Sequence, residues 1–242
     1  MRIDIWSDIV CPFCYVGKRN LEQALAEFEH RDEVEVVWHS FELDPSATEY
    51  PAGSLPEMIA SKYQMPLEQA IATQESLAER AREVGLDFNW RQARYGNTFD
   101  AHRVIQYATE QGLAAAAEEA FKKAYFTQGR SVQDHESILE IASEIGLDIA
   151  EVEAVLKSDR YAEHVRADEQ LARQLGINGV PFFLIESKWA VSGAQPAEAL
   201  VQALRQVWEE THHVEFLNPL AGAAGDDAAQ AGPSCDMNGN CS

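Results

Sequence analysis

The four cysteines of this chain form two pairs whose spacing suits redox chemistry or metal binding. Cys11 and Cys14 are separated by two residues, and Cys235 and Cys241 lie close to the C-terminus. In a reducing compartment, paired cysteines usually indicate thiol chemistry or a metal site rather than a structural disulfide. We therefore start from these two pairs and ask which elements of the chain would position them.

Cys11 is predicted to be the attacking thiol of the first pair. A short alternating strand, Arg2–Trp6, precedes it, and Pro12 fits the first position of a helix, where a missing N–H costs nothing. The free N–H groups and partial positive charge of a helix N-terminus would stabilise a Cys11 thiolate, the nucleophile in disulfide exchange. Cys14 falls one turn further along. We expect an exposed, attacking Cys11 and a more buried, resolving Cys14.

Half of a zinc site is the alternative interpretation of this C-x-x-C motif. Zinc needs four ligands, commonly from a second C-x-x-C motif or a pair of histidines. Here the second pair is Cys235 and Cys241, which are separated by five residues. A C-x-x-C motif between a strand and a helix is typical of redox-active proteins, so we predict no metal at this motif. A zinc-binding, chaperone-like module that uses all four cysteines stays as an alternative, which elemental analysis of purified protein would detect.

A proline at the start of a predicted strand is the second candidate feature. Pro181 lies between Val180 and Phe182, and a proline at the first residue of a strand loses no ladder hydrogen bond. A cis Val180–Pro181 bond would present the Val180 backbone beside the cysteines, where an extended substrate could pair with it. A trans bond is the ordinary alternative. The candidate substrate-binding residues here are Pro12, Phe13, Val180 and Phe182.

The hydrophobic periodicity predicts an α/β fold that positions these motifs. A strand, a helix that begins at Pro12 and a second strand over Glu33–Phe41 come first, and residues 55–175 are helical throughout. Two further strands, Pro181–Glu186 and Trp189–Ser192, and a final helix follow. Four Gly-Leu or Gly-Ile pairs, at 85, 112, 146 and 176, mark helix ends. We predict an α/β domain from residues 1–54 and 176–217, an inserted helical domain at 55–175, and a flexible tail at 218–242.

The composition limits the classes of partner. The chain has 242 residues with 19 Lys and Arg against 40 Asp and Glu, a net charge of −21. Such a charge repels phosphate backbones and anionic lipid, so we expect neither nucleic-acid nor membrane binding. No run approaches the roughly 18 apolar residues of a membrane helix, and the N-terminus does not have the pattern of a signal peptide. We therefore expect a cytoplasmic protein; the sequence specifies no oligomeric state.

Several motifs resemble the DsbA-like branch of the thioredoxin superfamily, and its FrnE-type members in particular. FrnE-type proteins are related to 2-hydroxychromene-2-carboxylate isomerases and kappa-class glutathione transferases. The resemblance implies a thioredoxin fold with a large all-helical insertion, catalytic roles for Cys11 and Cys14, and a cis Pro181 that faces them. It also makes Asn97, otherwise a helix cap, a candidate substrate-binding residue. The matching stretches are DIVCPFCYVGK at 8–18, NTFDAHR at 97–103, AYFTQGR at 124–130, GVPFF at 179–183 and VSGAQP at 191–196.

The resemblance implies a thiol-disulfide oxidoreductase or isomerase that acts on thiol- or disulfide-containing proteins. It would need no cofactor beyond its redox-active disulfide, with glutathione as a candidate reductant. Periplasmic DsbA relatives carry a histidine between the cysteines, and Phe13 cannot stabilise a thiolate as an imidazolium does, so we expect a weaker oxidant. The alternative within enzymes is a glutathione-dependent isomerase or transferase on a small aromatic substrate. Those relatives typically carry serine where this chain has Cys11.

The tail pair is a candidate secondary redox pair. Asn238-Gly239 is a turn-forming dipeptide between Cys235 and Cys241, so a small disulfide loop is feasible. A flexible tether of the length from Pro219 to Cys235 has an end-to-end distance of roughly 20–24 Å, enough to span much of a domain of this size.

We predict that truncation after Asn218 slows turnover, because the tail dithiol exchanges with the Cys11–Cys14 pair. Turnover and the redox state of Cys11 and Cys14 would be measured by mass spectrometry with and without the tail. Identical kinetics, together with no tail-to-active-site mixed disulfide in Cys14→Ser protein, would mean that the tail is inert.

Overall fold

The structure, a computed structural model, describes residues 1–47 and 53–212. Residues Met1–Val207 form one compact unit, and a second unit begins at Trp208. In the second unit the rings of Trp208 and His212 stack with their centroids 3.6 Å apart. Within the two described ranges, no helix has the length and apolar character needed to cross a membrane. The predicted tail, with Cys235 and Cys241, lies outside the described residues.

A four-stranded mixed sheet organises the first unit. Its order is β2-β1-β3-β4: β1 pairs with β2 in parallel, and β3 is antiparallel to both β1 and β4. Strands β3 and β4 form a hairpin, and Glu186 and Ser187 take the left-handed φ values of 50° and 55° that its turn requires. The predicted strands are confirmed to within two residues at each end. Their bounds are Arg2–Ser7 (β1), Glu35–Ser40 (β2), Phe182–Ile185 (β3) and Trp189–Ser192 (β4).

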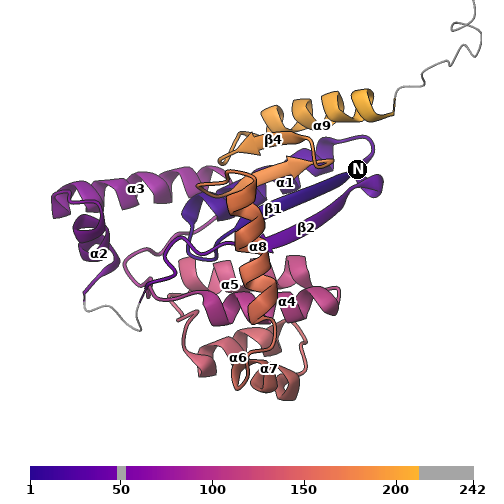
Figure 1. The fold of residues 1–242 in the computed structure, drawn as a ribbon. Helices are drawn as coiled ribbons and strands as arrows, with labels where there is room; N and C mark the ends of the chain where they lie inside the picture. The colour runs from indigo at the N-terminus through magenta and orange to yellow at the C-terminus, as the bar shows by residue number, and fades with distance from the viewer. Residues whose placement is uncertain (48–52, 213–242) are drawn as a thin grey trace, which may run out of the picture. The chain divides into compact units, whose positions relative to one another are not determined.

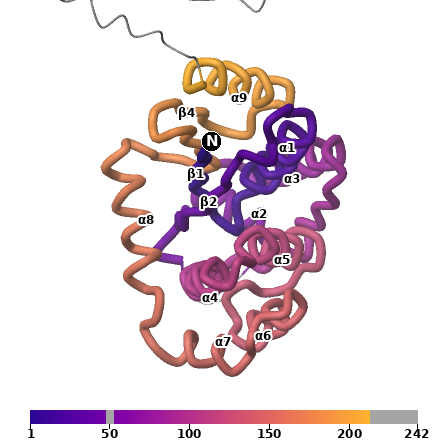
Figure 2. The backbone as a smooth tube through the Cα atoms, turned by 90° about the vertical axis from the view of Figure 1, so that its right-hand side faces the viewer, coloured from indigo at the N-terminus to yellow at the C-terminus, as the bar shows by residue number. Residues whose placement is uncertain are grey.

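Helices cover both faces of this sheet. Figure 2 shows α1 (Pro12–Glu27) on one side of β1 and β2, and α8 (Ala162–Gln174) on the other. A short 3-10 turn, Arg31–Glu33, connects α1 to β2. The final helix, α9 (Ala197–Thr211), buries the apolar face that its spacing predicts, including Leu200, Val201 and Leu204.

Among the residues that the structure describes between β2 and β3 there are seven helices, and α4 to α7 gather below the sheet in Figure 1. The four glycines at the predicted helix ends all have φ between 72° and 82°, and the residue after each donates its N–H to a carbonyl five residues earlier. This is the Schellman arrangement that the Gly-Leu pairs predict. The remaining bounds are α2 Leu55–Lys62, α3 Leu67–Glu83, α4 Phe99–Glu110, α5 Ala114–Phe126, α6 His135–Glu144 and α7 Ile149–Leu156.

The structure confirms the predicted fold class, a thioredoxin-like α/β fold with a large helical segment. The core of that segment continues into the sheet side, because Ile9 and Tyr15 belong to the same buried apolar cluster as Phe121 and Tyr125. Helix α8 also packs against β2. The division of the chain at residues 54 and 175 stays a prediction, since Met1–Val207 is one compact unit.

A histidine between two carboxylates ties α8 to the sheet. The ring of His39 on β2 lies 2.7 Å from Asp168 Oδ1 through Nδ1 and 2.7 Å from Asp4 Oδ1 through Nε2. Its face stacks on Trp6 with ring centroids 4.4 Å apart. Burial alone would lower the pKa of His39, but the hydrogen bonds and charges of Asp168 and Asp4 outweigh burial and raise it. Protonated His39 therefore stabilises the folded state.

We predict that His39→Gln lowers the free energy of unfolding by about 2 kcal/mol at pH 6, the scale of a hydrogen bond to a charged group. A raised folded-state pKa contributes stability that is present below the unfolded value and is lost as the pH rises through the folded value. The difference between the two proteins should therefore shrink at pH 9. Urea denaturation at both pH values measures it, with His164→Gln at an exposed position as the control. A difference that grows with pH would contradict this assignment.

Candidate active site

The two cysteines occupy the first turn of α1. Cys11 is the N-cap residue with an extended backbone, and Pro12 begins the helix as predicted. The N–H of Cys11 donates to the Asp8 carbonyl at 3.3 Å, and the N–H of Cys14 donates to the Cys11 carbonyl at 3.1 Å. Both cysteines are free thiols, and their side chains are hydrogen-bonded to each other. The helix therefore holds a dithiol that can close to a disulfide.

The exposure of Cys11 differs from the prediction. Cys14 is 1% exposed, as expected of a resolving thiol, but Cys11 is only 4% exposed rather than open to solvent. The physical reason is the chain around Val180, which lies against the sulfur: Cys11 Sγ–H donates to the Val180 carbonyl at 3.5 Å. A substrate must reach Cys11 from the side of this backbone segment.

The Val180–Pro181 bond is cis, as the resemblance implies. Pro181 packs directly on α1, where a Cβ added to Gly17 would lie 3.0 Å from Pro181 Cγ and 3.5 Å from the Phe183 ring. A side chain at residue 17 would push this strand away from the helix. The glycine therefore permits the close approach that brings the Val180 carbonyl to Cys11.

A largely apolar cavity of about 470 Å³ opens beside Cys11. Pro12, Phe13 and Val180, three of the predicted substrate-binding residues, line it together with Cys11. Its outer wall comes from α2 and α3, which the sequence placed in a separate domain and did not connect with the cysteines. The other lining residues are Val10, Leu43, Leu55, Met58, Ile59, Lys62, Tyr63, Met65, Thr73, Gln74, Leu77, Tyr95, Tyr125, Phe126 and Gly179.

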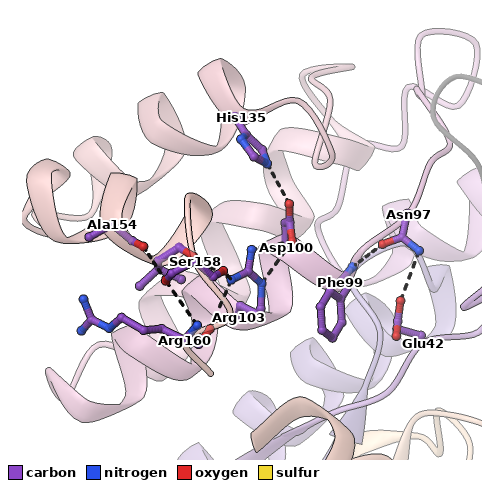
Figure 3. Close-up of polar contacts among 10 residues, drawn as sticks. Glu42, Asn97, Phe99, Asp100, Arg103, His135, Ala154, Ser158 and Arg160 are labelled. Atoms are coloured by element: carbon purple, nitrogen blue, oxygen red, sulfur yellow. Dashed lines mark hydrogen bonds and ion pairs between the residues drawn. The ribbon is translucent and has the colours of Figure 1, made fainter. Parts of the chain in front are cut away.

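Two predicted substrate-binding residues lie elsewhere. Asn97 acts at the start of α4, where its Oδ1 accepts from the Phe99 N–H at 2.8 Å and its Nδ2 donates to Glu42 at 3.3 Å (Figure 3). Its capping role is therefore the one present in the structure, and it does not line the cavity. Phe182 is half-buried on β3 and makes an edge contact with Trp6 instead.

Ion pairs fix α1 against α5. The carboxylate of Glu119 accepts from the Tyr15 hydroxyl and from Lys18 Nζ, each at 2.7 Å, and also pairs with Arg19. Burial alone would raise the pKa of Glu119, but the hydrogen bonds from Arg19, Lys18 and Tyr15 outweigh it and lower that pKa to about 2. This network holds the cysteine-bearing helix on the helical segment, and sequence reasoning missed it because Glu119 lies a hundred residues from its partners.

A group of buried charges surrounds the inner side of Cys14. Lys122 pairs with Glu118 one turn earlier on α5, and both are essentially inaccessible to solvent. His102 Nε2 lies 3.2 Å from Asp8 Oδ1. Burial is the main cause that raises the pKa of Cys14, the neighbouring Cys11 adds to it, and the Lys122 ammonium opposes it. In the sequence, the signal for the buried Glu118–Lys122 ion pair is a Glu and a Lys that are four residues apart among the core positions of α5.

In the part of the chain that the structure describes, no three or more His, Cys, Asp or Glu side chains are arranged to hold a metal ion. The arrangement can perform thiol chemistry: one sulfur borders a cavity, and a second sulfur lies directly behind it. Disulfide exchange requires this arrangement, because the attacking thiolate must be reached by the substrate and the resolving thiol must lie next to it.

Comparisons with known proteins identify similar sequences and structures. The chain is 43% identical to a probable DsbA oxidoreductase of Streptomyces coelicolor, with a TM-score of 0.84 that covers 100% of this chain and 98% of that one. It is 29% identical over 188 residues to the uncharacterized protein YwbO of Bacillus subtilis, which is 76% of this chain and 86% of YwbO. A 2-hydroxychromene-2-carboxylate isomerase shares the fold at 16% identity, with a TM-score of 0.67 over 87% of this chain and 98% of the isomerase.

The family follows from the extent of the sequence match. Residues 2–205 match the DSBA-like thioredoxin domain, a stretch that contains the cysteine pair, the cis-proline and the whole helical segment. This protein therefore belongs to the DSBA-like thioredoxin domain family of thiol-disulfide oxidoreductases.

Proposed function

We propose that this protein exchanges disulfides with other proteins through Cys11 and Cys14. In the reducing direction, the Cys11 thiolate attacks one sulfur of a substrate disulfide and the other substrate sulfur leaves as a thiolate. Cys14 then attacks Cys11, the Cys11–Cys14 disulfide forms, and the second substrate sulfur departs and takes up a proton. In the oxidising direction the same bonds form and break in reverse order.

The observation that carries this proposal is the placement of the two sulfurs. Cys11 borders the cavity beside the backbone carbonyl of Val180, while Cys14 lies next to Cys11 on the buried side. A substrate that occupied the cavity would therefore meet Cys11 first, and the mixed disulfide would form within reach of Cys14. A thiol such as glutathione would serve to reduce the resulting disulfide between cycles. A cytoplasmic location remains a prediction from the sequence.

Cys11→Ser should abolish disulfide reduction, because no nucleophile would border the cavity, and Cys14→Ser should accumulate mixed disulfides that it cannot resolve. Insulin reduction and mass spectrometry of trapped adducts measure the two effects. The matched control is Ala115→Ser, which introduces the same side chain at an exposed position of α5 outside the cavity.

The same variants distinguish disulfide exchange from the two alternative functions, a glutathione-dependent enzyme and a zinc-binding module. Activity with glutathione and a small aromatic substrate that survives Cys14→Ser would favour a glutathione-dependent isomerase or transferase. One zinc ion per chain, lost on replacement of either cysteine pair, would favour a zinc-binding module. Full insulin reduction by Cys11→Ser would exclude the proposed role of Cys11 itself.

The cavity also favours a class of substrate. Its walls are mainly aliphatic, aromatic and thioether groups, and Tyr63 at its rim is 63% exposed. A chain with a net charge of −21 repels acidic segments, and burial of an apolar side chain in this cavity would contribute roughly 1.5–3 kcal/mol. We infer that the enzyme prefers disulfides flanked by apolar residues.

Tyr63→Glu should therefore raise KM for a reduced or unfolded protein substrate severalfold and leave the turnover of a small, uncharged disulfide unchanged. Leu171→Glu is the matched control, since Leu171 is 39% exposed on α8 and does not line the cavity. Steady-state kinetics on both substrates measure the effect. Equal losses on the small and the large substrate would show that the cavity does not select the flanking residues.

A further inference from the structure

Two polar side chains in the wall of the cavity beside Cys11 have no role in the thiol exchange as described above. Gln74 lies on α3 and Tyr125 on α5, and they are 8% and 1% exposed. Within residues 1–47 and 53–212, neither the Gln74 amide nor the Tyr125 hydroxyl has a hydrogen-bond partner. Their polar atoms are not fully sealed, so the cavity is where these atoms can meet a bound molecule.

Three other polar side chains of the lining already have partners. Lys62 Nζ pairs with Asp44 at 3.0 Å, and the Tyr95 hydroxyl donates to the same carboxylate at 3.1 Å. The Thr73 hydroxyl donates to a backbone carbonyl one turn earlier on α3, at 2.9 Å. These contacts hold the wall together, and Asp44 neutralises the charge of Lys62.

The two unpartnered groups define the chemistry of a suitable ligand. A buried amide or hydroxyl without a partner costs free energy, so native proteins rarely retain one without a reason. An amide offers a donor and an acceptor side by side, and a phenol hydroxyl can donate or accept. A peptide group also has one donor and one acceptor, so it complements both. A carboxylate is less suitable, because Lys62 is the charged residue among the described lining residues and is already paired.

We propose that Gln74 and Tyr125 form a peptide-binding subsite, in which they hydrogen-bond backbone peptide groups of an unfolded segment beside the substrate disulfide. This inference rests on the proposed function and adds to it the group that is recognised. The apolar walls contribute affinity for the side chains of the segment, whereas the two polar groups select polypeptide over small disulfides that have no peptide bond. Neither residue takes part in making or breaking a bond.

Removal of the two polar groups distinguishes this binding role from a structural one. Tyr125→Phe removes a single oxygen, and Gln74→Met replaces the amide by an unbranched apolar side chain of similar length. Because neither group has a partner to lose, both variants should unfold at the same urea concentration as wild type or at a higher one. A structural hydrogen bond at either residue would give the opposite shift.

The kinetic probe is a short peptide with leucine and valine around a single cysteine that is joined to thionitrobenzoate. Release of the coloured thiolate follows attack by Cys11. Tyr125→Phe and Gln74→Met should each lower the second-order rate constant about two- to tenfold, the range that one neutral hydrogen bond provides. The mixed disulfide of mercaptoethanol and thionitrobenzoate should react at the wild-type rate. Gln69→Met and Tyr161→Phe, which lie outside the cavity, are the matched controls and should match wild type on both probes.

Replacement of single peptide bonds of the probe by esters tests the contact itself. An ester lacks the N–H donor and is a weaker acceptor than a peptide group. In wild-type protein, at least one ester should slow attack about two- to tenfold. The same ester should have little further effect in Gln74→Met or in Tyr125→Phe, because its partner is already absent. Esters that act equally in the variants and in wild type, or equal losses on both disulfides, would exclude the subsite.

A binding measurement distinguishes failure of this inference from failure of the proposed function. Cys11→Ser/Cys14→Ser protein cannot exchange disulfides, so fluorescence anisotropy of a dye-labelled peptide with serine in place of cysteine reports binding alone. Addition of Gln74→Met or Tyr125→Phe should weaken this binding about two- to tenfold. Unchanged binding, or no binding in any of the proteins, would overturn the subsite. Failure of wild-type protein to release thionitrobenzoate from either disulfide would instead overturn the proposed function.

Discussion

The close packing of α1 on the cis-proline segment is the constraint on which the site depends. Gly17 lets Pro181 approach so closely that even a Cβ at this position would lie only 3.0 Å from Pro181 Cγ, and nearly two turns earlier the Val180 carbonyl reaches Cys11. The same contact closes most of the Cys11 surface to water. An exchange reaction at this sulfur is therefore restricted to substrates that enter along one side of the helix N-terminus.

The helical segment completes the site from two directions. Helices α2 and α3 supply the apolar wall outside Cys11, while α4 and α5 supply the charges behind Cys14. The Glu119 network joins α5 to α1, so a displacement of the helical segment would move both the wall and the charges relative to the sulfurs. The helical segment thus supplies part of the candidate site and is packed into one unit with the thioredoxin-like sheet.

Local sequence patterns were enough to predict the helices and strands. They did not predict the contacts between segments that are distant in the sequence. Pro12 after Cys11 and the Gly-Leu pairs act within one or two turns, so the helix that begins at Pro12 and the four helix ends were predicted correctly. The burial of Cys11 depends on Val180, 169 residues away, and the sequence could not reveal that contact. Asn97 illustrates a second limit: a motif shared with a family identified the residue, but only its neighbours Phe99 and Glu42 show that it caps a helix here.

The two cysteines of this site have different surroundings, and each set of surroundings suits a different step of the proposed exchange. In the proposed exchange, Cys11 is the nucleophile that meets the substrate: the N-terminus of α1 would stabilise its negative charge, and the cavity gives access to its sulfur. In that exchange, Cys14 attacks only after Cys11 has joined a mixed disulfide, because a Cys11 thiolate has no disulfide bond for it to break. Burial raises the pKa of Cys14 and keeps the proton in place, while the Lys122 ammonium limits that rise.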